Sequence, residues 1–245
     1  MRTAFSLFEI LVVLSLVSIL AFFAFPKTNA TLNVAANSLL EHLSYARHLA
    51  LNDNLIYTDL EQTKSLKNRF KSIDEHGLIQ KNPMWQIQFH MKGEYAFTSY
   101  SIYVDTPRFA PTTNYDGRPM DGDIIAIGGN DRKCLSGYNN TNIAQACKNN
   151  SSVFIRLAEA YGLQDLHIES DKGCEGKRLN RIYFDRFGLP HCGKERVRLE
   201  HSVKIVLEKH GKKRAICILP SGYAFLLAKG NVRGNNCEEK SSYSL

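Results

Sequence analysis

The longest hydrophobic segment of the chain lies at its N-terminal end. Residues 5–25 form a run of 21 residues that is apolar apart from three serines and Glu9. A helix of this length rises about 32 Å, which is enough to cross the hydrocarbon core of a bilayer. The pattern therefore predicts a membrane-spanning helix over residues 5–25. A carboxylate inside such a segment costs roughly 2.5–3.5 kcal/mol, so Glu9 is expected to have a partner there.

Hydrophobic residues continue at helical spacing beyond this run. The pattern predicts one long helix over residues 5–53, loosened at Pro26 because proline lacks a backbone N–H. Residues 26–53 are its amphipathic part, and their apolar stripe is expected to pack on the domain that follows. The stripe consists of Leu32, Ala35, Ala36, Leu39, Leu40, Leu43, Ala46, Leu49 and Ala50.

From residue 54 onward the pattern favours strands. Apolar and polar residues alternate over 85–91, a turn signal occupies 92–94, and a β-branched and aromatic run covers 95–104. These features predict a hairpin, and a short buried strand is expected at 124–127. Turns are predicted at 210–212 and 220–222. Further strands are predicted over 153–157, 166–168, 182–187, 197–207, 214–219 and 223–228.

The predicted fold class is therefore α+β. A long N-terminal helix packs on a β-rich antiparallel domain over residues 54–245, and about 220 residues outside the anchor suffice for a sizeable core. In the strand predicted over 197–207, one face is apolar and the other is charged. The apolar face carries Val197, Leu199, Val203, Ile205 and Leu207.

The segment from Ala4 to Ile10 reads Ala-Phe-Ser-Leu-Phe-Glu-Ile. It resembles the processing site of type IV pilins and type II secretion pseudopilins, and Pro26 matches the family's proline at mature position 22. One departure is Ala4, because the family nearly always has glycine there. The resemblance implies that residues 1–4 are a leader, that a peptidase cuts between Ala4 and Phe5, and that Phe5 is then N-methylated.

The same resemblance gives Glu9 and Pro26 a role in assembly. Glu9 would neutralise the new amine of a neighbouring subunit in a staggered helical filament. The implied partners are other pilins or pseudopilins, the prepilin peptidase, the inner-membrane assembly platform and inner-membrane lipid. The implied location is the inner membrane, crossed once, with the C-terminal domain in the periplasm until the filament assembles. An ordinary signal anchor with a chance glutamate is the alternative interpretation of this segment.

Three further segments resemble the GspH/FimT branch of minor pseudopilins and minor pilins. One is the leucine- and alanine-rich stretch 39–50. The second is 182–190, which is similar to the branch's "Phe-Asp-x-x-Gly-x-Pro" strand and turn. The third is 216–223, which is similar to its final hairpin. The resemblance thus covers both ends of the chain and leaves residues 55–150 unexplained.

Six cysteines lie in the second half of the chain, and an even number in an exported domain favours disulfides. Six cysteines allow fifteen connectivities, of which neighbour pairing would close loops of 13, 18 and 20 residues. Free thiols and a metal site are alternatives, although no metal-ligand spacing is present. The candidates are Cys134, Cys147, Cys174, Cys192, Cys217 and Cys237.

The net charge of +7 is concentrated in residues 172–214, which hold 13 Lys and Arg against 5 Asp and Glu. Such a segment can bind phosphates, and some FimT-type minor pilins bind DNA through basic residues. The alternative is a solvated basic face or a contact with an acidic neighbouring subunit. The candidate contacts for DNA or another anionic partner are Arg196, Arg198, Lys204, Lys212, Lys213, Arg214, Lys229 and Arg233.

No catalytic motif is present, so the chain is not expected to be an enzyme and no cofactor is expected. Asp116, Asp121 and Asp123 lie in a glycine-rich loop, where turn chemistry is the simpler interpretation and calcium the alternative. His201 is expected on the apolar face of its strand, and Trp85 is expected in the core.

These features predict a minor subunit of a type IV filament machine that serves type II protein secretion. The alternative is a DNA-binding minor pilin of a type IV pilus or competence system, acting in natural transformation. The basic segment favours the alternative, whereas the strand motifs permit either.

Overall fold

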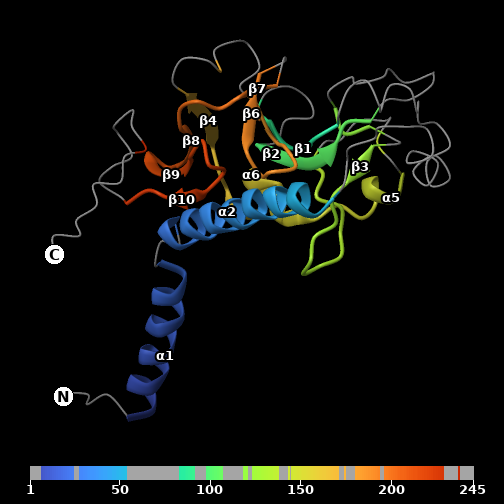
Figure 1. Cartoon of the computed structure of the whole chain (residues 1–245). Coiled ribbons are helices and arrows are strands. Elements are labelled where there is room, and N and C mark those ends of the chain that lie inside the picture. Colours follow the sequence, from blue (N-terminus) through green and yellow to red (C-terminus); the bar gives the residue numbers. More distant parts are fainter. Residues whose placement is uncertain are drawn as a thin grey trace, which may run out of the picture.

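A computed structural model shows two antiparallel sheets arranged along one helix (Figure 1). It describes residues 7–24, 28–53, 83–91, 98–106, 118–120, 123–137, 143, 145–170, 174, 180–193, 196–228 and 237.

The single helix predicted over residues 5–53 is not seen, and the fold-class prediction is wrong on this point. The structure has two N-terminal helices instead, α1 (Leu7–Ala24) and α2 (Thr28–Asn52). Pro26 lies in the sequence between them, and proline opposes a continuous helix because it lacks the N–H donor and crowds the preceding turn. Most of the remaining described chain is β-rich and antiparallel.

The predicted single-pass location in the inner membrane is also not supported. Among the residues that the structure describes, no helix is both long enough and apolar enough to cross a membrane.

The apolar stripe of α2 forms one wall of the core. Leu40 and Leu49 are partly buried, and the other members of the predicted stripe are buried. Burying each leucine contributes roughly 1.5–3 kcal/mol. The fully buried members of the stripe are Leu32, Ala35, Ala36, Leu39, Leu43, Ala46 and Ala50.

The first sheet has six strands in the order β3-β2-β1-β5-β6-β7. Its centre is the predicted hairpin, in which Trp85 pairs with Val104 and His90 with Ser99. The strands are β1 (Trp85–His90), β2 (Ser99–Val104), β3 (Ile124–Ile125), β5 (Arg181–Phe184), β6 (Pro190–Cys192) and β7 (Val197–Arg198).

The second sheet has four strands in the order β10-β9-β8-β4. The predicted turn between β8 and β9 is present, and His210 and Gly211 both have positive φ angles there, 49° and 71°. Two successive positive φ values are typical of tight hairpin turns. The strands are β4 (Asp165–Ser170), β8 (Val203–Lys209), β9 (Lys212–Ile218) and β10 (Ala224–Leu226).

Two strand predictions are wrong. Residues predicted as a strand over 153–157 form the 3₁₀ helix η1 (Val153–Ile155) and the start of α6 (Leu157–Tyr161); the other short helix is α5 (Gln145–Lys148). These five residues include four apolar ones around Arg156, and so short a segment fits either the helical or the strand period, so the sequence pattern could not distinguish them. The strand predicted over 197–207 is divided between β7 and β8, which belong to different sheets.

The outer face of the hairpin is polar and buried. Alternation places Gln86, Gln88 and His90 on one face of β1, yet all three side chains are buried. Two of them are held by hydrogen bonds: Tyr103 donates its hydroxyl to Gln88 Oε1 at 2.7 Å, and His90 Nε2 lies 2.8 Å from Ser101 Oγ. Burial lowers the pKa of His90 to about 3, and the positive charge of Arg181 adds to the effect.

The buried His90 makes stability depend on pH. In the unfolded chain a histidine binds a proton near pH 6.5, whereas His90 in the folded protein stays neutral down to about pH 3. Unfolding therefore takes up a proton in this window, and the free energy of unfolding should fall by about 1.4 kcal/mol per pH unit as the pH drops. The substitution His90→Gln should reduce this slope by about one proton, measured by urea unfolding between pH 6 and pH 4.

His42 contributes in the same direction in both proteins, because burial also lowers its pKa. His48 is exposed on α2, so His48→Gln is the matched control and should leave the slope unchanged. Equal slopes for wild type and His90→Gln would contradict the assignment.

Candidate assembly surface

α1 presents apolar side chains around its whole circumference. They follow one another along the helix at about 100° per residue, so no face is polar. Figure 1 shows α1 directed away from the body of the molecule. A helix that is apolar all round is normally covered by protein or lipid, so α1 is a surface that needs a partner. The exposed side chains are Phe8, Ile10, Leu11, Val12, Val13, Leu14, Leu16 and Val17, with exposed fractions of 41–74%.

Glu9 is the only ionisable residue of α1. Two serines in the helix add little polarity, because Ser15 Oγ donates to Val12 O and Ser18 Oγ to Leu14 O, both at 2.8 Å. Such bonds to the preceding turn satisfy the hydroxyl groups within the helix. The predicted processing residues Ala4 and Phe5, together with Pro26, lie outside the described residues.

The basic residues of the β8–β9 hairpin brace the start of α2. Arg214 Nε donates to Asn33 Oδ1 at 2.6 Å, and Lys209 Nζ donates to Thr31 Oγ1 at 2.9 Å. The Lys209 ammonium also donates to the Tyr161 carbonyl at the end of α6, at 2.6 Å, where a positive charge is favourable. Two of the cations in this hairpin therefore hold the fold together.

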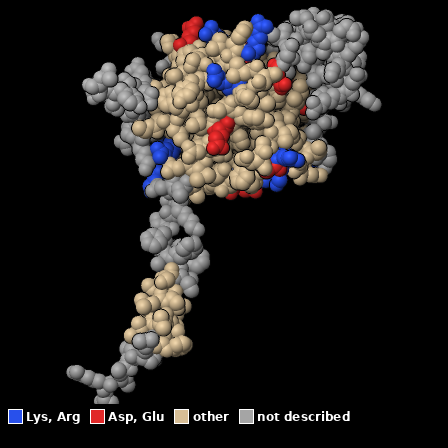
Figure 2. All heavy atoms as spheres, turned by 60° about the horizontal axis from the view of Figure 1, so that its bottom comes forward, with Lys and Arg blue, Asp and Glu red and all other residues tan. Residues whose placement is uncertain are grey.

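The predicted anion-binding residues do not form one patch. Arg196 and Arg198 belong to β7 and its preceding turn, in the first sheet, whereas Lys212 and Lys213 belong to β9 in the second. Arg196 lies over the Tyr183 ring, 5.3 Å from its centroid. On the face in Figure 2, Lys and Arg appear as small separate groups. Lys229 and Arg233 lie outside the described residues.

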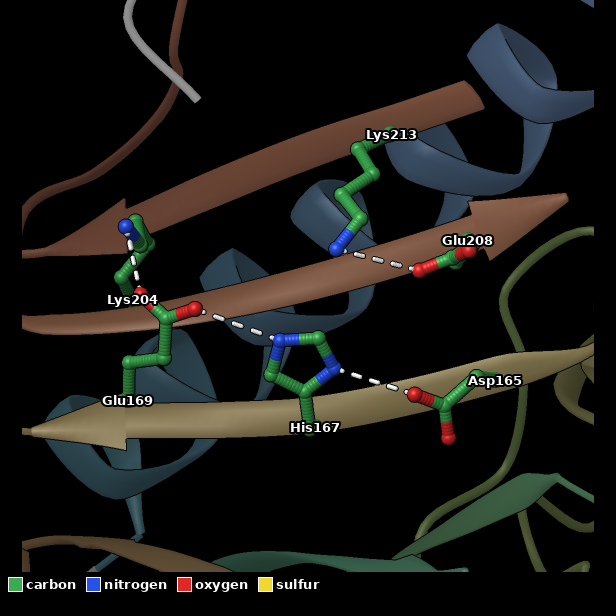
Figure 3. A network of polar contacts seen from close by, with 6 residues as sticks. All are labelled: Asp165, His167, Glu169, Lys204, Glu208 and Lys213. Atoms are coloured by element: carbon green, nitrogen blue, oxygen red, sulfur yellow. Dashed lines mark hydrogen bonds and ion pairs between the residues drawn. The ribbon is translucent and has the colours of Figure 1, made fainter. Parts of the chain in front are cut away.

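Lys204 is buried and belongs to a polar network on the outer face of the second sheet (Figure 3). It pairs with Glu169 on the adjacent strand β4, with an N···O distance of 2.5 Å. The His167 ring lies between two carboxylates of the same strand. Its Nε2 is 3.2 Å from Glu169 and its Nδ1 is 3.1 Å from Asp165. Lys204 is therefore in the interior, out of reach of an external anion.

The network also explains the ionisation of Glu169. Burial alone would raise the pKa of this carboxyl, but the hydrogen bond and charge of Lys204, and then His167, outweigh it and the pKa lies below its usual range. Near the β8–β9 turn, Lys213 Nζ lies 3.2 Å from Glu208. Lys212 is exposed at the same hairpin.

The cysteines form three disulfides between neighbours in sequence. Their separations of 13, 18 and 20 residues are those of the neighbour pairing considered for the sequence. Cys217–Cys237 attaches the C-terminal segment to the outer face of the second sheet, where both sulfurs join a small apolar cluster with Val206 and Ala215. The pairs are Cys134–Cys147, Cys174–Cys192 and Cys217–Cys237.

The acidic loop is explained in part by turn chemistry. Asp123 is buried and accepts hydrogen bonds from the backbone N–H groups of Thr106 and Met120, at 3.0 and 2.9 Å. Asp116 and Asp121 lie outside the described residues. Within the described part of the chain, no group of three or more His, Cys, Asp or Glu could hold a metal ion.

The other two residues singled out in the sequence lie in different environments. Trp85 is buried as predicted, and its indole N–H donates to Asp53 Oδ2 at 2.9 Å, which ties the end of α2 to β1. His201 is exposed in the bend before β8, so its predicted place on an apolar strand face is wrong. The bend exists because the chain leaves one sheet for the other between Arg198 and Val203.

The sequence did not reveal the role of Arg47. Its Nε donates to Gly188 O at 3.1 Å and its Nη2 to Ser221 O at 3.4 Å, so one α2 side chain joins the β5–β6 and β9–β10 turns. Both turns were visible in the sequence as glycine-containing segments, but nothing in the pattern placed them side by side. A Cβ on Gly222 would lie 2.1 Å from Gly188 O, so the two turns need glycine to approach this closely.

Comparison with known proteins adds no family. No family model, no curated protein and no solved structure matches this chain.

The Lys204–Glu169 pair gives a test of the network. Glu169→Gln removes the carboxylate that faces the buried ammonium of Lys204. The free energy of unfolding should fall by about 1–2 kcal/mol. This is less than for a fully buried ion pair, because the Glu169 side chain is 41% exposed and solvent screens the charge. Asp165→Asn is the control on the same strand and should cost less than about 0.5 kcal/mol. Urea unfolding at pH 7 measures both, and equal effects would mean that Lys204 does not depend on Glu169.

Proposed function

We propose that this chain is a minor subunit of a type IV filament machine, a pseudopilin-like protein that serves type II protein secretion. The chain works by assembly, without a catalytic step. A prepilin peptidase trims it between Ala4 and Phe5, and α1 joins the helices of neighbouring subunits. The observation that carries the proposal is the exposed apolar circumference of α1, which has one acid, Glu9, and no base.

The charge of Glu9 supports this form of assembly. Cleavage before Phe5 would create a positive amine four residues from Glu9, about 6 Å along a helix. In a staggered bundle the carboxylate of one subunit can face the amine of the next. Apolar surroundings strengthen such a pair and penalise an unpaired charge, so the same contact selects the register of the helices.

The distribution of basic residues supports protein contacts more than DNA capture. Lys204 is buried against Glu169, and Arg214 is bonded to Asn33. The candidate cations are divided between two sheets. A phosphate backbone is bound best by a continuous row of cations, which these residues do not provide.

Removal of the Glu9 charge tests the proposal directly. Glu9→Ala should leave the body folded but lower recovery of the chain in sheared filaments by at least about tenfold, because one ion pair worth about 1.4 kcal/mol or more is lost. Ser15→Ala, in the same helix, is the control and should be recovered like wild type. Normal recovery of Glu9→Ala would sink the proposal, as would a mature N-terminus other than Phe5.

DNA binding is the second candidate function, and the exposed Lys212 at the β8–β9 turn, beside Lys213, is the observation that favours it. If this hairpin captures DNA, changing Lys212, Lys213 and Arg214 to alanine should weaken binding at least about tenfold, and wild-type binding should weaken steeply with salt. Arg186→Ala, a basic residue outside this hairpin, is the matched control. A salt titration of DNA binding by the full chain measures all three proteins, and absence of binding at low salt leaves secretion as the function.

A further inference from the structure

His191 lies between the two turns that connect β5 to β6 and β6 to β7. It is the middle residue of β6, and its side chain is only 14% exposed. Its Nε2 lies 3.1 Å from Asp185 Oδ2 in the first turn, and its Nδ1 lies 2.8 Å from the carbonyl oxygen of Arg196 at the end of the second. One imidazole ring therefore joins both turns.

Both partners of this ring are hydrogen-bond acceptors. A backbone carbonyl has no hydrogen to donate, and neither has an ionised carboxylate, whereas a neutral imidazole carries one N–H and one bare nitrogen. The other oxygen of Asp185 accepts the backbone N–H groups of Phe187 and Leu189, both at 2.9 Å, which is the arrangement of a carboxylate. Only the protonated ring, which carries an N–H on each nitrogen, can donate to both partners.

We propose that His191 is a proton-dependent latch, which closes the β6–β7 turn when the ring is charged and releases it when the ring loses a proton. The neutral ring keeps one N–H. Hydrogen bonds to charged acceptors are stronger than those to neutral ones, so the remaining N–H stays on Nε2, facing Asp185. The bond from Nδ1 to the Arg196 carbonyl is the one that is lost.

The geometry of the β6–β7 turn favours its opening. Arg196 has a φ angle of 52°, a left-handed conformation that residues other than glycine rarely adopt. β7 is the last strand in the order of its sheet, and it pairs with β6 over two residues. β6 is held more firmly, because Cys192 forms a disulfide with Cys174 and Arg47 binds the turn before it. Loss of the latch therefore frees β7 and leaves β6 in place.

The charged and titratable neighbours of the ring act in opposite directions. The Asp185 carboxylate stabilises the positive ring. On the adjacent strands, Tyr183 of β5 and Arg198 of β7 are the cross-strand partners of His191, and the Arg196 guanidinium lies over the Tyr183 ring. The two arginines oppose a further positive charge. Removal of the Asp185 charge should therefore uncouple the latch from pH.

The latch has the opposite pH dependence to the buried His90. The contacts of His191 are made by the charged ring, so they are complete at acidic pH and one of them is lost as the pH rises. The neutral His90 instead destabilises the fold as the pH drops. The latch also goes beyond the proposed function, because all of its residues belong to one copy of the chain.

Nuclear magnetic resonance of the ¹⁵N-labelled full chain tests the latch between about pH 5 and about pH 9. The ring ¹⁵N shifts report which nitrogens carry a proton. The exchange protection factor of the Leu199 amide reports the β6–β7 pairing, because this N–H donates to Pro190 O at 2.9 Å. His191 should carry both protons at the acidic end and only the Nε2 proton at the alkaline end. The protection factor of Leu199 should fall at least about tenfold with this loss.

Asp185→Asn is the most specific variant, because the amide keeps the shape of the side chain and turns one acceptor into a donor. Its oxygen can still accept the two backbone N–H groups, while its NH₂ group donates to Nε2. A neutral ring can then keep its proton on Nδ1 and hold Arg196 at every pH. The alkaline tautomer should therefore change from Nε2–H to Nδ1–H, and the protection of Leu199 should no longer fall. His201→Gln, at an exposed histidine in the bend after β7, is the matched control and should behave like wild type.

Three results would overturn the inference. They are a neutral His191 ring in the wild type at acidic pH, equal protection of Leu199 at both ends of the pH range, and an unchanged tautomer in Asp185→Asn. If this variant does not fold, the wild-type spectra decide the question alone. None of these results depends on the recovery of Glu9→Ala in filaments, so the latch and the proposed function are tested separately.

Discussion

The packing of α2 against both sheets is the interaction on which the rest of the structure depends. Its stripe belongs to one core cluster that contains Ile87 and Phe184 from the first sheet and Ile205 and Ile216 from the second. The sheets share no strand, so the helix is what makes them one body. Polar contacts at its two ends complete the arrangement: Asn33 holds the β8–β9 hairpin, and Arg47 holds the β5–β6 and β9–β10 turns.

α1 lacks the packing that makes α2 stable. Its described apolar side chains are exposed, whereas most of the stability of a helix in a folded protein comes from tertiary packing. The free energy that α2 gains inside one chain is therefore available to α1 only through contacts with another molecule. In the proposed filament, α2 would stabilise the fold within one chain, and α1 would be covered only when a second subunit binds.

The sequence predicted those parts of the fold that depend on local periodicity. The stripe around Leu39 and the alternation around Ile87 each match a single period over many residues, and both are buried in the structure. The strand prediction failed where the chain passes from one sheet to the other while the alternation of apolar and polar residues continues. Leu199 and Val203 keep the same parity, so the crossing between them left no trace in alternation, although Glu200 and His201 are exposed in the bend.

The candidate site was harder to predict because a count of charges does not show where each charge is used. Lys204 looks like an exposed cation on the polar face of its strand, yet Glu169 arrives from a strand 35 residues earlier and neutralises it in the interior. Gln88 and His90 alternate correctly with their apolar neighbours but are buried, held by hydrogen bonds with Tyr103 and Ser101. Cross-strand partners are set by topology, which no single-chain pattern encodes.

Several of the basic residues in 172–214 therefore have a structural role, whatever their function. Lys209 and Arg214 attach the second sheet to the start of α2, and Lys204 ties β8 to β4. Cations with such internal partners are poorly placed for an external anion, because binding it would require breaking bonds that hold the sheets to the helix. Large apolar side chains, in contrast, are exposed on α1 and at Phe187 and Tyr223. Under the proposed function, association through this apolar surface follows more readily from the structure than binding of a polyanion does.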